Sequence, residues 1–168
     1  MTFKSLSFFL FNLFIMVGLD QAIKYWVTHT IPLETEISLI PFISLYHVHN
    51  SGIAFSFLSS FPHWVFILFT IIMIIFLLGL WNNTKNIQTK TLSSFGIVGI
   101  IGGAIGNLID RIRFHYVIDY ISLHVDGIFS FAIFNLADTF ITLGAIAILI
   151  DELFLYPKKR RSFDTFPE

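Results

Sequence analysis

Two aspartates, Asp119 and Asp138, stand 19 positions apart in otherwise apolar stretches, FHYVIDYI and FNLADTF. Ionisable groups at membrane depth are costly, and they mark functional sites. Two carboxyl groups held close together cannot both ionise, so one keeps its proton as an acid while the other acts as a base. The pair therefore predicts, as a hypothesis, the acid–base hydrolysis that aspartic proteases perform.

The composition is that of an integral membrane protein. Of 168 residues, 55% are hydrophobic, 12% are charged and 21 are Phe, and the mean hydropathy is +0.80. Such a chain is too apolar for a water-soluble domain. Four stretches reach or approach the roughly 20 apolar residues that cross a bilayer. We expect a mainly α-helical single domain with transmembrane helices at about 6–26, 64–81, 92–109 and 136–156.

The distribution of Lys and Arg predicts the orientation, because these residues favour cytoplasmic loops. Most of the basic residues outside the helices fall on one side, at Lys4, Lys85, Lys90 and the tail at 157–168. We expect both termini in the cytoplasm and two outer loops, at about 27–63 and 110–135. Arg111 and Arg113 fall on the outer side against the rule, and their position beside Asp110 suggests ion pairing or contact with lipid headgroups.

Several function classes are excluded or disfavoured. The chain has no Cys, hence no disulfide, no thiolate nucleophile and no lipid-modified Cys of its own. His47 and His49 alternate as on one strand face, but no third ligand has a recognised spacing, so we expect structural or surface histidines and no metal. No phosphate-binding loop is present, and no cofactor is expected. The net charge of −1 gives no reason to expect nucleic acid, and the basic tail suits anionic lipid.

The N-terminal apolar run resembles a secretory signal peptide. It ends in Gly18-Leu19-Asp20-Gln21 without a small-residue cleavage site, so we expect it to stay as a helix. Short strands are expected at 42–49, 116–121 and 128–134, the last two joined by an Asp126-Gly127 turn. A small extracytoplasmic β-rich region is therefore predicted.

One face of the third helix carries small residues and then polar ones. At 100° per residue, one stripe contains Gly96, Gly99, Gly103, Gly106, Asn107 and Asp110. Glycines at this spacing let helix backbones approach closely in lipid. The packed face therefore delivers polar groups to the outer end of the bundle.

Polar residues of several segments are expected to meet at that outer end. They are Asp20 and Lys24, Asn107 and Asp110, Asp119, and Asn135 and Asp138. Asp20 and Lys24 have the spacing of an ion pair on one helix face. Asp110 suits a structural ion pair with Arg111. Asp138 suits either a helix cap or, since it shares a face with Asn135 and Thr142, a cavity that receives a membrane-embedded substrate.

Several blocks together resemble the lipoprotein signal peptidases, also called signal peptidase II. They follow one another in order across nearly the whole chain: Leu19-Asp20-Gln21 with Lys24; Asn50-Ser51-Gly52-Ile53-Ala54-Phe55; Gly102-Gly103-Ala104-Ile105-Gly106-Asn107-Leu108-Ile109-Asp110-Arg111; Val117-Ile118-Asp119; and Phe134-Asn135-Leu136-Ala137-Asp138. In one departure, the Pro expected two residues before Phe134 is Ala132. This departure concerns the local shape before the last helix and not the chemistry.

The resemblance implies a membrane aspartic protease that removes the signal peptide of a diacylglyceryl-modified prolipoprotein before the lipidated Cys. It implies Asp119 and Asp138 as the catalytic dyad and no cofactor. The substrate-binding or supporting residues that it implies are Asp20, Lys24, Asn50, Gly52, Gly103, Asn107, Asp110, Arg111, Asn135 and Ala137. We expect a monomer in the bacterial inner membrane whose partners are the embedded substrate and lipid. Residues 32–61 are expected to cover the site as a lid.

Two alternatives remain from other classes. Intramembrane aspartates also serve proton relays, which would suit a small proton- or ion-coupled transporter. Against a transporter, the carboxylates cluster on one side, and the four expected helices contain no internal repeat. A non-enzymatic membrane assembly factor is the other alternative, and it would tolerate Asp to Asn substitution at both positions.

Overall fold

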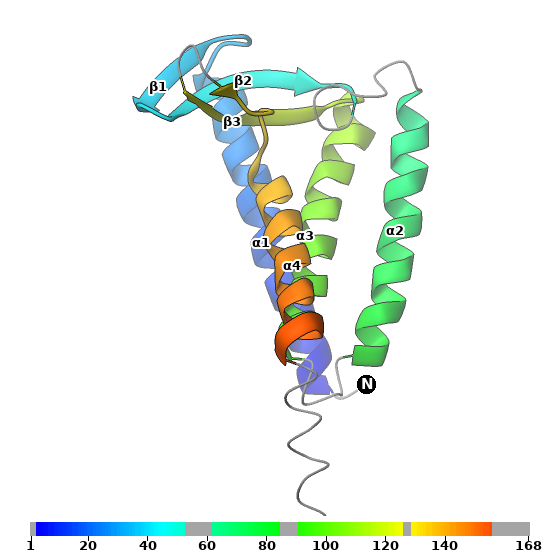
Figure 1. Cartoon of the computed structure of the whole chain (residues 1–168). Helices are drawn as coiled ribbons and strands as arrows, with labels where there is room; N and C mark the ends of the chain where they lie inside the picture. The colour runs from blue at the N-terminus through cyan, green and yellow to red at the C-terminus, as the bar shows by residue number, and fades with distance from the viewer. Residues whose placement is uncertain (1–2, 53–61, 85–90, 126–128, 156–168) are drawn as a thin grey trace, which may run out of the picture.

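A computed structural model describes residues 3–52, 62–84, 91–125 and 129–155. Its helices are α1 (Phe3–Thr30), α2 (His63–Thr84), α3 (Thr91–Phe114) and α4 (Leu136–Ile150), and the π-helical turn η3 (Asp151–Leu155) continues α4. The helices run side by side, and a small sheet lies across one end of the bundle (Figure 1).

Three of these helices, α1, α2 and α3, are long and apolar enough to cross a membrane. The α4 helix has 15 residues, which at 1.5 Å per residue is short for a complete crossing. The bundle is thus mainly helical with three candidate membrane spans, and α4 packs along it with the same orientation as α2 (Figure 1).

The α3 helix lies at the centre and contacts α1, α2 and α4. Its glycines explain the close approach to α4. A Cβ added at Gly96 would stand 2.5 Å from the carbonyl oxygen of Gly144, and one added at Gly103 would collide with the carbonyl oxygen of Ala137. The predicted stripe is therefore confirmed as a tight helix interface. Gly106 extends it to α1, where an added Cβ would meet the carboxylate of Asp20.

Two apolar clusters hold the ends of the bundle. Phe9 of α1, Trp81 of α2 and Ile101 of α3 belong to one cluster, away from the sheet. Val27 of α1 and Ile31, which follows this helix, pack with Ile118 and Tyr120 in the other. This second cluster fixes the sheet onto the end of α1, close to the predicted dyad.

The sheet is antiparallel with the order β1-β2-β3-β4. Its strands are β1 (Glu36–Ile40), β2 (Ile43–Asn50), β3 (Val117–Val125) and the short β4 (Phe129–Ser130). The β2 and β3 strands confirm two of the three predicted strands. The third, 128–134, is wrong in extent, because after Ser130 only an isolated bridge of Phe134 to Ile121 remains. Sequence analysis missed β1, whose five residues are all exposed and show no alternation of burial.

Some helix boundaries were also predicted wrongly. The α3 helix runs on to Phe114, so Asp110, Arg111 and Arg113 are helical and do not begin a loop. The predicted helix ended where the run of apolar residues ended, at the first charged residue. A helix can continue past a charged residue whose side chain has a partner. The α4 helix ends at Ile150, before the π-helical turn. Residue 156, the Asp126-Gly127 turn, residues 53–61 of the expected lid, Lys85, Lys90 and the basic tail lie outside the described residues.

Candidate active site

Both predicted catalytic aspartates line one cavity. Asp119 lies near the start of β3 and is buried, and Asp138 lies in the first turn of α4 and is half-buried. The cavity has a volume of about 450 Å³. Asn50, Asn107 and Arg111 form its polar part, and its remaining wall is mostly apolar, from residues such as Phe131, Phe134, Ile141 and Leu143. The two carboxyl groups therefore share one cavity, and Asp138 occupies both of the positions that the sequence left open, in a helix cap and in a cavity wall.

The start of α4 fixes the position of Asp138. Asn135 is the N-cap: its side-chain oxygen accepts the Asp138 backbone N–H at 2.9 Å, and its own backbone N–H is donated to Asp138 Oδ2 at 3.2 Å. This reciprocal capping box satisfies free N–H groups of the first helical turn. The Tyr120 hydroxyl accepts the N–H of Leu136 at 3.1 Å, and Asp20 Oδ1 accepts the N–H of Ala137 at 3.0 Å. Groups from three segments therefore define where α4 begins.

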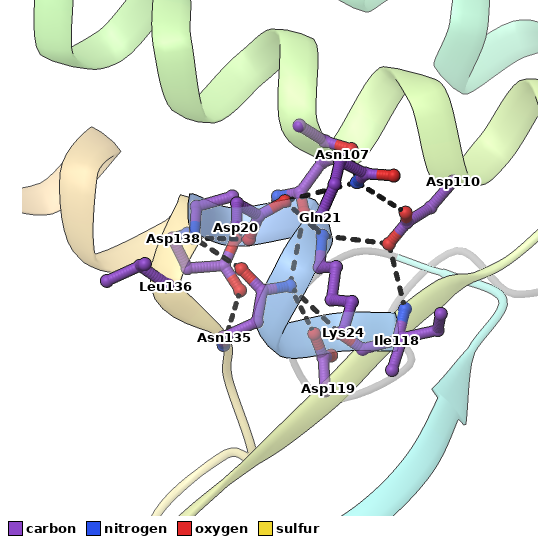
Figure 2. Close-up of polar contacts among 12 residues, drawn as sticks. Asp20, Gln21, Lys24, Asn107, Asp110, Ile118, Asp119, Asn135, Leu136 and Asp138 are labelled. Carbon is purple, nitrogen blue, oxygen red and sulfur yellow. Dashed lines mark hydrogen bonds and ion pairs between the residues drawn. The ribbon is translucent and has the colours of Figure 1, made fainter. Parts of the chain in front are cut away.

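Asn135 also connects the two aspartates. Its side-chain nitrogen donates to Asp119 Oδ1 at 2.7 Å (Figure 2). The other oxygen of Asp119 accepts from Asn50 Nδ2 at 2.8 Å, and Asp138 Oδ1 accepts from Asn107 Nδ2 at 2.8 Å. Each of the four carboxyl oxygens thus has an amide donor. These donors hold both groups in place without supplying a charge that would neutralise them.

The surroundings favour the protonated form of one carboxyl group. Burial, reinforced by repulsion from Asp138, raises the pKa of Asp119 to about 7, although the amide donors of Asn50 and Asn135 act in the opposite direction. The dyad can therefore hold one proton near neutral pH. An arrangement with one ionised and one protonated carboxyl group supplies the base and the acid of a hydrolysis.

A buried charge cluster supports the site from behind. Lys24, which is 1% exposed, lies 3.0 Å from Asp20 and 2.8 Å from Asp110, and it donates to Asn107 Oδ1 at 3.0 Å. The predicted pairing of Asp20 with Lys24 is confirmed. The predicted pairing of Asp110 with Arg111 is wrong, because the helix directs the Asp110 carboxylate toward α1, where the ammonium of Lys24 lies between two carboxylates.

Arg111 has a different role. Its guanidinium donates to the carbonyl oxygen of Gly52 at 3.2 Å and lies over the Phe66 ring at 5.7 Å. Gly52 in turn donates its N–H to the Asn50 side chain at 3.0 Å. Arg111 thus ties the segment that carries Asn50 to α3. Among the predicted supporting residues, Gly103 and Ala137 act through the α3–α4 contact described above.

Sequence reasoning missed two contributors. Gln21 donates to Asp110 Oδ1 at 3.0 Å and to the carbonyl oxygen of Gly106 at 3.2 Å. The sequence could have indicated this role of Gln21, because Gln21 follows Asp20 directly and lies one helical turn before Lys24. Tyr120 follows Asp119 directly, but its capping role depends on the fold. His47 proves structural: it is buried and its ring donates to the carbonyl oxygen of Ile31 at 2.8 Å.

Comparisons with known proteins agree with this geometry. The family model for signal peptidase (SPase) II matches residues 12–154. The lipoprotein signal peptidase of Bartonella bacilliformis is 68% identical over 164 residues, which cover 98% of each chain. That of Sinorhizobium fredii is 46% identical over 152 residues, which cover 89% of each chain.

The fold has solved counterparts as well. A bacterial membrane enzyme solved by the in meso method at 2.3 Å superposes with a TM-score of 0.76, at 31% identity, over 88% of each chain. A second structure of this description, at 1.9 Å, gives a TM-score of 0.75 over 88% of this chain and 94% of the other. These comparisons give no support to the transporter alternative. The chain belongs to the signal peptidase II family of bacterial inner-membrane proteases.

Proposed function

We propose that the protein removes the signal peptide from diacylglyceryl-modified prolipoproteins, cutting before the lipidated Cys, with Asp119 and Asp138 as the catalytic dyad. The observation that carries this proposal is the single, largely apolar cavity that both carboxyl groups line. A substrate that is itself embedded in lipid needs an apolar cavity with few, well-placed polar groups. The curated relatives are named for this substrate class.

The proposed mechanism uses one proton held by the pair. The raised pKa of Asp119 favours Asp119 as the acid and leaves Asp138 as the base. Asp138 takes a proton from a water molecule, whose oxygen then bonds to the peptide carbonyl carbon, while Asp119 gives its proton to the carbonyl oxygen. Breakdown of this intermediate breaks the C–N bond. The leaving amine takes the proton from Asp138, and a hydroxyl of the intermediate returns one to Asp119.

The polar groups around the dyad would position the substrate. Asn50, Asn107 and Arg111 line the cavity beside the carboxyl groups, and we assign them to binding the peptide around the cut bond. The apolar wall would hold acyl chains and the signal peptide. Because Asp119 and Asp138 of the same chain line one cavity, the dyad needs no residue from a second copy, and we propose a functional monomer.

We further propose a topology with the sheet outside and both termini in the cytoplasm. In this arrangement α4 with η3 forms the fourth crossing, about 20 residues long. Because the chain has no Cys, single introduced cysteines can test the topology. A membrane-impermeant thiol reagent applied from outside should label Glu34→Cys, in the exposed turn between α1 and β1, and not Lys158→Cys in the tail. The reverse pattern would overturn the orientation.

The catalytic proposal is tested with purified protein and a lipidated prolipoprotein in detergent, where no ion gradient exists. Wild type should cut before the lipidated Cys, and folded Asp119→Asn and Asp138→Asn should be inactive. Asp151→Asn is the matched control, since Asp151 is a buried carboxyl group bonded to Ser93 at the other end of the bundle. Cleavage by either dyad variant, or none by wild type, would overturn the proposal. Absence of cleavage by folded wild type would also return the non-enzymatic assembly factor as an alternative.

A further inference from the structure

A second cavity lies behind the candidate active site, where α1 and α3 end beneath the sheet. Its volume is about 500 Å³. Residues of both helix ends and of β2 line it, among them Thr28, Arg113 and His49. The dyad does not line this cavity. Its floor, formed by Gln21, Lys24 and Asp110, is shared with the polar cluster that supports the site.

The rim of this cavity carries three nitrogen-bearing side chains, each held against an aromatic ring. The His29 ring lies 4.0 Å from the Tyr25 ring, and the His49 ring is stacked on Tyr116 at 3.8 Å. The guanidinium of Arg113 lies over the Phe114 ring at 4.9 Å. Aromatic contacts of this kind hold a cation or an imidazole in place before any ligand arrives.

Arg113 is the basic residue of this cavity whose charge is not paired by any described residue. Within the part of the chain that the structure describes, it forms no ion pair, whereas Arg111 is accounted for by Gly52 and Phe66. The negative charge of Asp110 on the cavity floor is offset by Lys24 at 2.8 Å. The rim therefore presents a guanidinium that is free for an external anion. Burial and the nearby His47 lower the pKa of His49, so His49 would add a neutral donor.

The level of the cavity matches a membrane surface. Two candidate spans, Leu6–Thr30 and Leu92–Phe114, end at its rim. Tyr25 and Trp26 on α1 are 66% and 49% exposed, and exposed Tyr and Trp are enriched at the headgroup level of membrane proteins. Anions at this level are the phosphates of phospholipids.

Below the rim, α1 offers a surface for acyl chains. Phe14 and Gly18 precede Tyr25 by 11 and 7 positions, which places all three on one helix face. Phe14 is 77% exposed, and an added Cβ at Gly18 would meet nothing within 4 Å among the atoms of the protein. An open apolar track that leads to a basic rim fits a diacyl lipid better than a free anion.

We propose that this cavity is a binding site for the headgroup phosphate of an anionic phospholipid, with Arg113 as the principal contact and His49 as an additional donor. The site is separate from the dyad and does not depend on the proposed cleavage reaction. A lipid bound here would brace the ends of α1 and α3 where they support the active site.

Native mass spectrometry of the detergent-purified protein, titrated with phosphatidylglycerol, tests the proposal. Loss of a charge-assisted hydrogen bond to phosphate should weaken retention of one lipid about tenfold in Arg113→Gln. Lys85→Gln, which removes the same charge elsewhere in the sequence, should bind like wild type. Monogalactosyldiacylglycerol, which lacks phosphate, should bind weakly and equally to all three proteins.

A competition experiment and a second variant complete the test. Inorganic phosphate at millimolar concentration should not displace phosphatidylglycerol, and full displacement would mean that the site takes a free anion and not a lipid. His49→Phe is the second variant; it keeps a ring to stack on Tyr116 and is expected to weaken retention about threefold as a neutral hydrogen bond is lost. The midpoint of thermal unfolding in detergent reports that each variant is folded. Equal phosphatidylglycerol retention by wild type, Arg113→Gln and His49→Phe would overturn the proposal.

Discussion

Asp20 Oδ1 accepts the backbone N–H of Ala137 at 3.0 Å, across 117 positions of sequence and directly before Asp138. A side chain of α1 therefore caps the helix that carries one member of the dyad. Since α1 and α4 otherwise touch little, this hydrogen bond is the main polar link between them near the site.

The two substitutions Asp20→Ala and Asp20→Asn should separate capping from charge. Loss of the cap in Asp20→Ala should lower the free energy of unfolding by about 1–2 kcal/mol and reduce kcat by misplacing Asp138. Asp20→Asn keeps an acceptor for the Ala137 N–H and should lose less of both. Thermal unfolding in detergent and the rate of prolipoprotein cleavage measure the two effects. Equal losses in the two variants would show that the charge of Asp20, and not its capping bond, matters.

Removal of the buried ammonium should be more damaging. Lys24→Met leaves the carboxylates of Asp20 and Asp110 buried together without a cation, which should destabilise the fold by about 3–5 kcal/mol. The double variant Lys24→Met with Asp20→Asn removes one charge of each sign and should recover part of this loss. Unfolding midpoints of the single and double variants check the coupling. A double variant less stable than Lys24→Met would rule out the proposed electrostatic cause.

The raised pKa of Asp119 predicts a pH dependence of cleavage. The dyad needs one proton, and Asp119 loses it as the pH rises through about 7. The cleavage rate at saturating substrate should therefore fall at higher pH, by about tenfold per pH unit once the acid form is the minor one. A rate that stays level from pH 7 to 9 would show that Asp119 is not the group that holds the proton.

The raised pKa of Asp119 also makes the stability of the fold depend on pH. The direction is opposite to that expected for a salt-bridged carboxylate. A carboxyl group whose pKa rises on folding favours the folded state most when protonated, below its ordinary pKa of 3.8. This contribution is lost as the pH rises toward about 7. The unfolding midpoint of wild type should therefore fall over that pH range more than the midpoint of Asp119→Asn. Parallel curves for the two proteins would contradict the assigned shift.

The sequence predicted what depends on neighbouring residues and missed what depends on distant ones. Apolar runs located all four helices, and the glycine stripe located the α3–α4 contact. The partner of Asp110 was wrong because Lys24 lies far away in sequence, whereas Arg111 is adjacent. The capping of α4 by Asp20 and Tyr120 also joins distant segments. No local pattern contains such contacts, and the exposed β1 strand leaves no periodic signal.

One added methyl group tests the packing of α3 against α4. The backbone of Gly103 lies so close to Ala137 that an added methyl group would collide with the Ala137 carbonyl oxygen. Gly103→Ala should push away the first turn of α4, which carries Asp138, and lower cleavage by at least about a hundredfold if the carboxyl group moves by 1 Å.

Gly79→Ala is the matched control, because an added Cβ there meets nothing within 4 Å among the atoms of the protein. This substitution in α2 should leave cleavage unchanged and stabilise the helix by about 0.5–1 kcal/mol. Cleavage by Gly103→Ala at the rate of Gly79→Ala would mean that α4 tolerates the displacement. In that case the position of Asp138 would depend on the capping contacts of Asn135 and not on the close approach of the two helix backbones.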